Sequence, residues 1–338
     1  MRVLVIGGTN FIGPPTIEML AAKGHEVTVF HRARHEVQFS ADVRHVHSPY
    51  ASMPVRHVPE SLADPPPEVV LYMVPVGEED AVAVMSRFHG VARRIVGISS
   101  GDVYRAYGRL TGIEPGPPDP IPLTEDAPLR EVLYPHRAPE AGPEDWTFHY
   151  EKILVERVLQ GDSELPSTIL RLPAVYGPGD PNHRLRPYVL RMYDRRPRIP
   201  LASSLASWRW THGYVDNVAH AIALAVTSPN AAGRVYNVGE ELAPTAGERV
   251  QRLGTTVGWR GKVTSIRLDA EHLPPHLRPP YDLKQNLVMD TRRIREELGY
   301  KEIVSEDDGL RRTAVWEWTQ PSVEGDPTPE EYAVEESL

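Results

Sequence analysis

The first thirteen residues constrain this chain most, because an apolar strand runs directly into a glycine-rich turn. Residues 3–6 read Val-Leu-Val-Ile, and the turn that follows consists of Gly7, Gly8, Thr9, Asn10, Phe11, Ile12 and Gly13. In such a turn one glycine permits the sharp bend, and another lets the next helix pack closely on the strand, while free amides at the helix start face phosphates. A second apolar strand at 27–30 completes the unit. The pattern therefore predicts a βαβ unit that binds a dinucleotide.

The composition narrows the class of protein. The chain has 338 residues, enough for one large or two modest domains, and its net charge of −9 argues against general nucleic-acid binding. It contains no cysteine, which excludes disulfides and thiolate chemistry. The sequence carries no signal-peptide or membrane-span pattern, so we expect a cytoplasmic protein that does not bind membranes.

Strand and helix signals alternate through the first half of the chain. Apolar strands are predicted at 69–74, 94–98 and 168–172, with a helix at 79–90. This alternation is typical of a Rossmann-type α/β fold with a doubly wound parallel sheet. We expect that domain to comprise 1–179 and 209–239, a smaller mixed α/β substrate lobe to comprise 180–208 and 240–320, and 321–338 to form an acidic flexible tail.

A Pro- and Gly-rich stretch without periodicity lies between Tyr104 and Trp146. A loop of that length inside a compact domain is usually functional or disordered. Because it emerges beside the strand that ends in Ser99 and Ser100, we expect it to form a lid or to shape the substrate site. A surface excursion is the alternative.

Motifs along nearly the whole chain resemble, in their order, those of the extended short-chain dehydrogenases/reductases, the NAD(P)-dependent epimerase/dehydratase family. They are the glycine turn and the segments 99–104, 152–156, 170–179, 214–218, 235–239 and 290–300. The glycine turn also resembles that of atypical members such as the chloroplast stem-loop-binding proteins. The resemblance implies a nicotinamide dinucleotide in the Rossmann domain and a second lobe that covers the cleft.

The resemblance also implies roles for single residues. In this family a Ser hydrogen-bonds the substrate oxygen, a Tyr four residues before a Lys exchanges the proton, and the Lys holds the nicotinamide ribose and lowers the pKa of the Tyr. Ser100 and Lys152 match the family Ser and Lys. The further cofactor contacts that the resemblance implies are Ser99, Leu172, Pro173 and Val175.

The position of the family Tyr, four residues before Lys152, holds Phe148, which cannot exchange a proton. Tyr150 lies two residues further along, about 200° around a continuous helix, and should therefore face away. A local distortion at the start of the helix is the alternative that would bring Tyr150 back to the site.

Three other residues are candidates for the missing acid or base. Asp102 comes first, since it matches a position where sugar-nucleotide dehydratases carry a Glu, although the acid that precedes it there is Gly101 here. Tyr104 and His149 follow. The alternative readings are that Asp102 caps a turn, that Tyr104 is structural and that His149 has no part in catalysis.

The end of the second strand bears on the choice between NAD and NADP. An NAD site normally carries an acidic residue there, which binds the ribose 2′-hydroxyl. This chain has Arg32 and Arg34 instead, and guanidinium groups suit a 2′-phosphate. We expect NADP in preference to NAD. The alternative is that both arginines are solvated and that Glu36 reaches the ribose.

An arginine-rich stretch stands out in the otherwise acidic chain, with Arg184, Arg186, Arg191, Arg195, Arg196 and Arg198. It predicts an attraction for anionic substrates such as nucleotide diphosphates, or else a solvated helix face. We place Arg184, Arg186, Arg209 and His212 at the substrate site, with Trp208 and Trp210 as cleft or core residues. Two sugar-nucleotide features are weakened, since Ala174 replaces the family Asn and Arg209 lies one residue before the family Arg.

These features predict an NAD(P)-dependent epimerase, dehydratase or reductase that acts on a hydroxyl or carbonyl carbon of a polar, anionic or sugar-like metabolite. The first alternative is an NADP-binding regulator that lost turnover with the family Tyr, and an RNA-associated role is disfavoured by the acidic charge. The resemblance implies a homodimer through helices at 79–90 and 148–159. We expect no metal site, because His45 and His47 lie two apart without a carboxylate set.

Overall fold

One parallel β-sheet forms the core of the protein in the computed structural model, which describes residues 1–338 except 51–52, 54 and 270. Its strands are β1 (Arg2–Ile6), β2 (Glu26–His31), β3 (Val43–His47), β4 (Val69–Tyr72), β5 (Arg94–Ser100), β6 (Ser167–Leu172) and β10 (Val235–Asn237). They lie in the order β10-β6-β5-β4-β1-β2-β3, with parallel neighbours throughout. The predicted doubly wound Rossmann-type α/β fold is confirmed.

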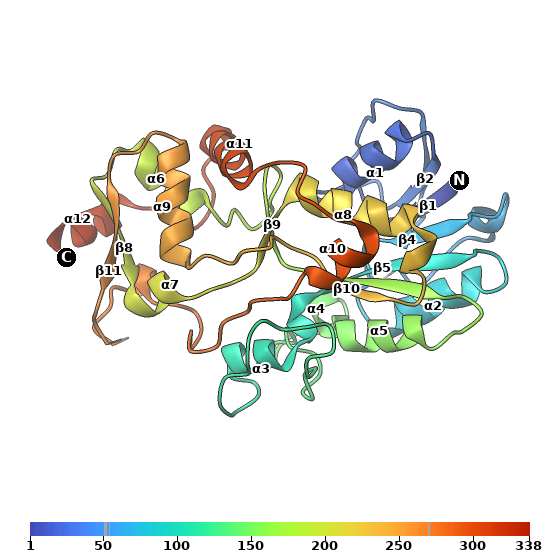
Figure 1. Cartoon of the computed structure of the whole chain (residues 1–338), viewed down its shortest axis with the longest axis horizontal. Coiled ribbons are helices and arrows are strands. Elements are labelled where there is room, and N and C mark those ends of the chain that lie inside the picture. Colours follow the sequence, from blue (N-terminus) through green and yellow to red (C-terminus); the bar gives the residue numbers. More distant parts are fainter. Residues whose placement is uncertain (51–52, 54, 270) are drawn as a thin grey trace.

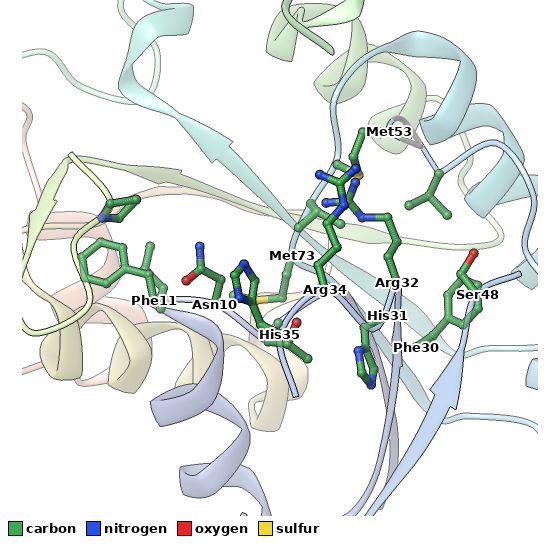
Figure 2. A pocket seen from close by; sticks show the side chains of 17 residues that line it. Asn10, Phe11, Phe30, His31, Arg32, Arg34, His35, Ser48, Met53 and Met73 are labelled. Atoms are coloured by element: carbon green, nitrogen blue, oxygen red, sulfur yellow. The ribbon is translucent and has the colours of Figure 1, made fainter. Parts of the chain in front are cut away.

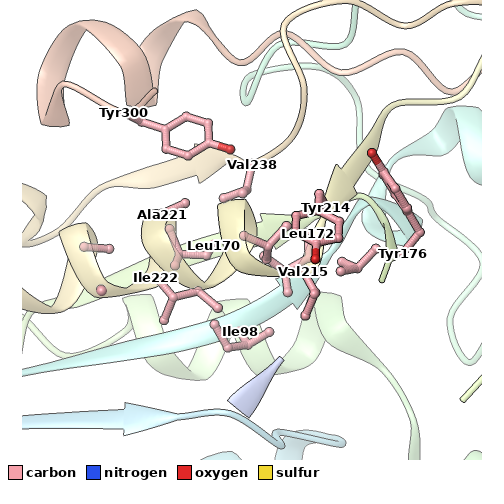
Figure 3. Close-up of a cluster of buried hydrophobic side chains, with 14 of the residues drawn as sticks. Ile98, Leu170, Leu172, Tyr176, Tyr214, Val215, Ala221, Ile222, Val238 and Tyr300 are labelled. Atoms are coloured by element: carbon pink, nitrogen blue, oxygen red, sulfur yellow. The ribbon is translucent and has the colours of Figure 1, made fainter. Parts of the chain in front are cut away.

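Helices cover both faces of this sheet (Figure 1). The helices α1 (Gly13–Ala22) and α8 (Val215–Thr227) pack on one face, and α2 (Glu78–Phe88) and α5 (Lys152–Gln160) pack on the other. Because both faces are buried, the central strands β1 and β4 are apolar along almost their whole length instead of alternating. Figure 3 shows Ala221 and Ile222 of α8 in one buried cluster with Ile98 and Leu170 of the sheet.

A smaller second lobe lies beyond the carboxyl ends of the strands (Figure 1). The parallel pair β7 (Ala174–Tyr176) and β9 (His212–Tyr214) joins it to the sheet domain, and β8 (Arg198–Ala202) pairs with β11 (Lys262–Ile266) inside it. Its helices are α6 (Arg186–Tyr193), α7 (Ser203–Ser207), α9 (Ala246–Thr256) and α11 (Glu306–Thr319). The helix α10 (Arg292–Leu298) falls in the range expected for this lobe, but it packs on α8 and β10 of the sheet domain.

The Pro- and Gly-rich stretch after Tyr104 is folded against the end of the sheet. It contains α3 (Arg105–Thr111) and ends at α4 (Trp146–His149). Leu123 forms an isolated β-bridge with Met289, and both side chains belong to a buried apolar cluster. The stretch is thereby held beside the carboxyl end of β5, where some of its side chains line a cavity described below.

The acidic end of the chain is not the flexible tail that its composition predicts. It forms α12 (Pro329–Ser337), on which Glu335 is buried against Arg191, with Nε 3.1 Å from Oε1. Asp326 likewise binds the buried Arg186, with Nη2 2.7 Å from Oδ2. Acidic residues of this segment therefore pair with arginines of α6, and such pairing between distant segments is invisible to composition. Among the residues described, no helix is long and apolar enough to cross a membrane.

Candidate functional site

A cleft of about 380 Å³ opens at the carboxyl ends of β1 and β2, where the predicted glycine turn forms one wall. The predicted residues Gly7, Gly8, Thr9, Asn10, Phe11 and Ile12 all line it. Gly13 lies behind the turn, and a Cβ there would come within 2.2 Å of the carbonyl oxygen of Gly8. Among the described residues, none accepts a hydrogen bond from the amides of Phe11 or Ile12. Such free amides at a helix start fit the diphosphate of a dinucleotide.

Arg32 and Arg34 line the same cleft beyond the end of β2. Figure 2 shows both side chains extending in the same direction from this end of the cleft. Burial lowers the pKa of Arg32, and the charge of Arg34 lowers it further, so the two cations are close neighbours. Glu36 does not line the cleft; its carboxylate lies 3.0 Å from Nε2 of His47. The alternative in which Glu36 reaches the ribose therefore finds no support in this geometry.

A histidine cluster on β2 and β3 contains a carboxylate that the sequence pattern did not reveal. Candidate ligand atoms of His31, Glu36 and His45 lie within 4.8 Å of one another. However, Nε2 of His31 lies 3.0 Å from Nδ1 of His45, and Nδ1 of His31 accepts from the amide of Ala33 at 3.2 Å. A metal-bound histidine usually donates its second nitrogen to an acceptor, so this arrangement favours a hydrogen-bonded histidine pair over a metal site.

The other cofactor residues implied by the resemblance lie at different places. Ser99 is buried and donates from its hydroxyl to Glu156, with 2.5 Å between the oxygens, so its side chain does not face the cleft. Leu172 and Pro173 line a second cavity, beside Ser100. Val175 is buried in the core, and its carbonyl accepts from Nε of Arg184 at 3.1 Å.

This second cavity, of about 350 Å³, holds the predicted catalytic residues Ser100 and Asp102 in its wall. The hydroxyl of Tyr150 lies 2.8 Å from Oδ2 of Asp102 and also hydrogen-bonds Ser100. Nζ of Lys152 lies 5.4 Å from the centre of the Tyr150 ring. The expectation that Tyr150 faces away is thus wrong, and the alternative of a distorted helix start describes the structure.

The distortion consists of two extended residues between α4 and α5. Tyr150 has ψ 112°, and Glu151 has φ −156° and ψ 98°. Glu151 is fully buried, where its carboxylate accepts from Nη2 of Arg130 at 3.1 Å and from the amide of Ile153 at 2.8 Å. It therefore caps α5 as its N-cap residue, and the helix begins only at Lys152.

Phe148 lies away from the catalytic cavity on the short helix α4. The guanidinium of Arg137 lies 4.1 Å from the centre of its ring and 3.6 Å from the ring of Tyr134. Arg137 also donates from Nε to the carbonyl of Phe148 at 2.8 Å. Phe148 thus has a packing role, and the side chain does not occupy the place of the family Tyr.

Charges around Asp102 decide which groups hold protons. Burial disfavours ionisation of Asp102, but hydrogen bonds from His136 and Tyr150 outweigh it and keep its pKa below the usual value. Burial and the neighbouring Asp102 carboxylate raise the pKa of Tyr150 well above that of a free phenol. In this arrangement Asp102 is ionised and Tyr150 carries its proton. Nε2 of His136, a side chain about a third exposed at 35%, lies 3.4 Å from the same Asp102 oxygen.

Lys152 is buried beneath this group. Its Nζ donates to the carbonyl of Ile98 at 3.1 Å and to the carbonyl of Pro75. Burial lowers its pKa to about 8, although the carboxylates of Asp102, Asp80 and Glu156 act against the shift. The ammonium therefore lies buried beside Tyr150, and Lys152 belongs neither to the wall of the nucleotide cleft nor to that of the second cavity.

The two remaining acid/base candidates do not reach the cavity. Tyr104 is buried, donates to Asn237 at 2.6 Å and accepts from Arg171 at 3.0 Å; burial raises its pKa to about 12. Nε2 of His149 lies 2.8 Å from the carbonyl oxygen of Pro143, and His149 is not among the residues that line the cavity. Both geometries favour the structural readings of these residues.

Only part of the predicted substrate set lines a cavity. Arg184 borders the catalytic cavity, and together with His212 it also lines an adjacent cavity of about 290 Å³. Arg186 is instead held by Asp326, and Arg209 is exposed and donates to the carbonyl of Ala243 at 2.7 Å. Of the other arginines in the stretch, Arg191, Arg196 and Arg198 hold α12. The cavity also contains residues that the sequence analysis missed, namely Tyr107, His136, Asn182 and Tyr281.

The model of the NAD dependent epimerase/dehydratase family matches residues 3–239 of the chain. The chain belongs to this family. Among solved structures it is similar to TunA, described as an NAD dependent NDP-hexosamine 5,6-dehydratase involved in tunicamycin biosynthesis. That likeness has a TM-score of 0.65 and 20% identity, and covers 95% of this chain and 99% of TunA, so it bears on the fold.

The curated relatives of the chain are named for different activities. The 2-alkyl-3-oxoalkanoate reductase of Stenotrophomonas maltophilia is 26% identical over 92% of this chain and 98% of that enzyme. The 3-diazoavenalumate denitrifying reductase of a Streptomyces species is also 26% identical, over 73% of this chain and 78% of the relative. The uncharacterized protein y4nL of Sinorhizobium fredii matches over 54% of this chain, which spans 57% of that protein.

Proposed function

We propose that this member of the family is an NAD(P)-dependent oxidoreductase that acts on a hydroxyl or carbonyl carbon of a polar metabolite. The observation that carries the proposal is the contact of the Tyr150 hydroxyl with Asp102 and Ser100, which line the catalytic cavity, together with the nearby ammonium of Lys152. Family membership supports an enzyme of the epimerase, dehydratase or reductase type. The two curated relatives described above that carry an enzyme name are both reductases.

The nicotinamide, when bound, supplies the hydride acceptor or donor. Ser100 holds the substrate oxygen through its hydroxyl, and Tyr150 donates its proton to that oxygen as the carbonyl is reduced. The high pKa of Tyr150 keeps the phenol protonated at neutral pH but opposes release of that proton, so the transfer depends on a group that stabilises the phenolate. Lys152 orients the ribose and, as a nearby cation, stabilises the phenolate that the transfer leaves behind.

Asp102 and His136 return a proton to Tyr150 in this scheme. Oδ2 of Asp102 lies 2.8 Å from the Tyr150 hydroxyl and 3.4 Å from Nε2 of His136. Since His136 is partly exposed, it connects the buried phenol to solvent. In the oxidative direction the same proton passes from Tyr150 through Asp102 to His136. Asp102 is thus a proton relay here, and the family Tyr has its counterpart in Tyr150.

We propose NADP as the preferred cofactor. Two adjacent arginines line the cleft where the ribose 2′-position is expected, and the nearby Glu36 is bound to His47. A 2′-phosphate would screen the mutual repulsion of the two cations, whereas a 2′-hydroxyl would not. NAD remains the cofactor named for TunA.

A homodimer and a cytoplasmic location also stay proposals. The resemblance places a dimer interface on the helices α2 and α5, which lie side by side on the outer face of the sheet. The regulator without turnover rested on Phe148 at the family Tyr position, and the place of Tyr150 weakens that alternative. For the substrate, the solved neighbour suggests a sugar nucleotide, and the curated relatives suggest an oxo acid.

Isotope transfer tests the proposed activity. We would incubate the protein with NADPH deuterated at the nicotinamide C4 and a panel of ketones, and with NADP⁺ and UDP-glucose. The proposal predicts deuterium on a product carbon, or reduction of NADP⁺ by the sugar nucleotide. Reversible binding of the nucleotide without transfer to any compound would contradict the proposal and support the regulator.

A further inference from the structure

We propose that the substrate of this site is a singly charged carboxylate with an apolar body, such as an oxo acid or its hydroxy counterpart, and not a nucleoside diphosphate sugar. The inference rests on the proposed function for the reacting end of the molecule. Its own support comes from the cations and the apolar side chains that line the catalytic cavity and the adjacent one.

The cationic side chains that line the two cavities can bind one negatively charged group. Of the described residues that line them, Arg184 and Arg249 are the arginines, and neither cavity wall includes a lysine. Arg249 is buried between Glu240 and Glu306, with Nη1 3.3 Å from the Glu306 carboxylate, so acidic partners already neutralise its charge. Burial and the charge of Arg249 push the pKa of His212 well below its usual value, and His212 is therefore neutral.

Arg184 is held through the inner nitrogen of its guanidinium group. Its Nε donates to the carbonyl of Val175 at 3.1 Å, and Asp180 lies 3.8 Å from the same nitrogen. Within the part of the chain that the structure describes, neither terminal nitrogen of Arg184 has a recorded hydrogen bond. Two parallel N–H groups of this kind match the two oxygens of a carboxylate.

The position of Arg184 makes it a suitable anchor for the far end of a substrate. Arg184, Asn182 and Trp210 line both cavities and therefore mark their junction. The guanidinium lies 5.6 Å from the centre of the Trp210 ring, which fixes its plane beside an aromatic wall. A carboxylate bound here leaves the carbonyl or hydroxyl of the same molecule to reach Ser100 in the catalytic cavity.

Apolar side chains make up about half of the wall of the catalytic cavity and most of the wall of the adjacent cavity. Leu123, Leu172, Leu287 and Met289 line the catalytic cavity. Such a surface favours an alkyl or aryl body, because burying apolar area is favourable and leaves no hydroxyl unsatisfied. A diphosphate sugar presents two negative charges and many hydroxyls. Among the described residues these cavities offer one guanidinium with terminal nitrogens that no protein group occupies, and that guanidinium already lies near the carboxylate of Asp180.

The test compares 3-oxooctanoate with its methyl ester in wild type, Arg184→Gln and the control Arg209→Gln, whose side chain lies outside both cavities. Binding to the NADPH-loaded protein is measured by tryptophan fluorescence, since Trp208 and Trp210 line the cavity, and reduction is measured by NADPH oxidation. We expect the wild type and Arg209→Gln to bind the acid at least tenfold more tightly than the ester. In Arg184→Gln the Kd of the acid rises about tenfold or more, and that of the ester stays within twofold.

The two readouts separate failure of this inference from failure of the proposed function. Charge-selective, Arg184-dependent binding without NADPH oxidation would contradict the proposed function and leave the inference supported. Equal binding of acid and ester, an equal effect of Arg184→Gln on both, or tighter Arg184-independent binding of UDP-glucose would overturn the inference. In Arg184→Lys, which keeps the charge but not the paired N–H groups, we expect partial recovery of acid binding.

Discussion

The chemistry of the site depends on where one phenol lies. The hydroxyl of Tyr150 is 2.8 Å from Asp102, and Phe148 packs under Arg137 instead. A phenol can exchange a proton and a phenyl ring cannot, so the exchange of these two positions decides between an enzyme and a binding protein. In the nucleotide cleft, we propose that Arg32 and Arg34 decide in the same way between NADP and NAD.

Replacing Arg32 and Arg34 tests that choice. Removing one arginine from a phosphate contact should weaken the binding free energy of NADPH by about 1.5–3 kcal/mol, because hydrogen bonds to charged groups contribute that much. We expect Arg32→Ala and Arg34→Ala to weaken NADPH binding about tenfold or more and to change NADH binding by less than about twofold, measured by fluorescence titration. The exposed Arg44 on β3 serves as the control position. Equal losses for the two nucleotides would contradict a 2′-phosphate contact.

At the scale of elements, the break between α4 and α5 builds the site. A continuous helix would carry Tyr150 away from Lys152, whereas two extended residues bring the Tyr150 ring within 5.4 Å of the Lys152 ammonium and its hydroxyl within 2.8 Å of Asp102. The break is held by the buried Glu151, which pairs with Arg130 and caps α5. Gly77 on the neighbouring loop helps, since a Cβ there would lie 2.3 Å from the carbonyl of His149.

Substitution of Glu151 should therefore affect stability and the site together. Glu151→Ala leaves Arg130 buried without its partner, a change that typically costs about 3–5 kcal/mol, and it frees residues 150–151 to become helical. We expect a lower denaturation midpoint and a loss of NADPH turnover. Glu144→Ala, an exposed change in the same stretch, should alter stability by less than about 0.5 kcal/mol. A stable, fully active Glu151→Ala protein would contradict this account of the break.

Local patterns in the sequence predict the glycine turn, most strands of the central sheet and the positions of Ser100, Asp102 and Lys152, because each depends on neighbours in the chain. The place of Tyr150 could not be predicted this way. It depends on Arg130, twenty-one residues from Glu151, and helical periodicity carries no information about such a pair. For the same reason the sequence pattern places arginines of α6 at a substrate site, although the structure pairs them with acidic residues about 140 positions further along the chain.

At the scale of the whole molecule, the two lobes contribute different parts of the site. The sheet domain supplies the nucleotide cleft and the proton-transfer group at the carboxyl ends of its strands, as open α/β sheets generally do. The second lobe adds Arg184 and the aromatic wall. Acidic residues near the end of the chain pair with the arginines of α6, Asp326 with Arg186 and Glu335 of α12 with Arg191. The catalytic cavity is lined from both, so chemistry and substrate choice come from different parts of the chain.

The most direct test of the central claim is single-turnover hydride transfer in Tyr150→Phe and Phe148→Tyr, followed by NADPH absorbance with the best ketone of the panel. We predict that Tyr150→Phe slows the step about 10²–10⁴-fold, the usual contribution of a positioned proton donor, with NADPH affinity within about twofold of wild type. Phe148→Tyr should leave the rate unchanged. A Tyr150→Phe protein at the wild-type rate, or a faster Phe148→Tyr protein, would contradict the claim that Tyr150 donates the proton.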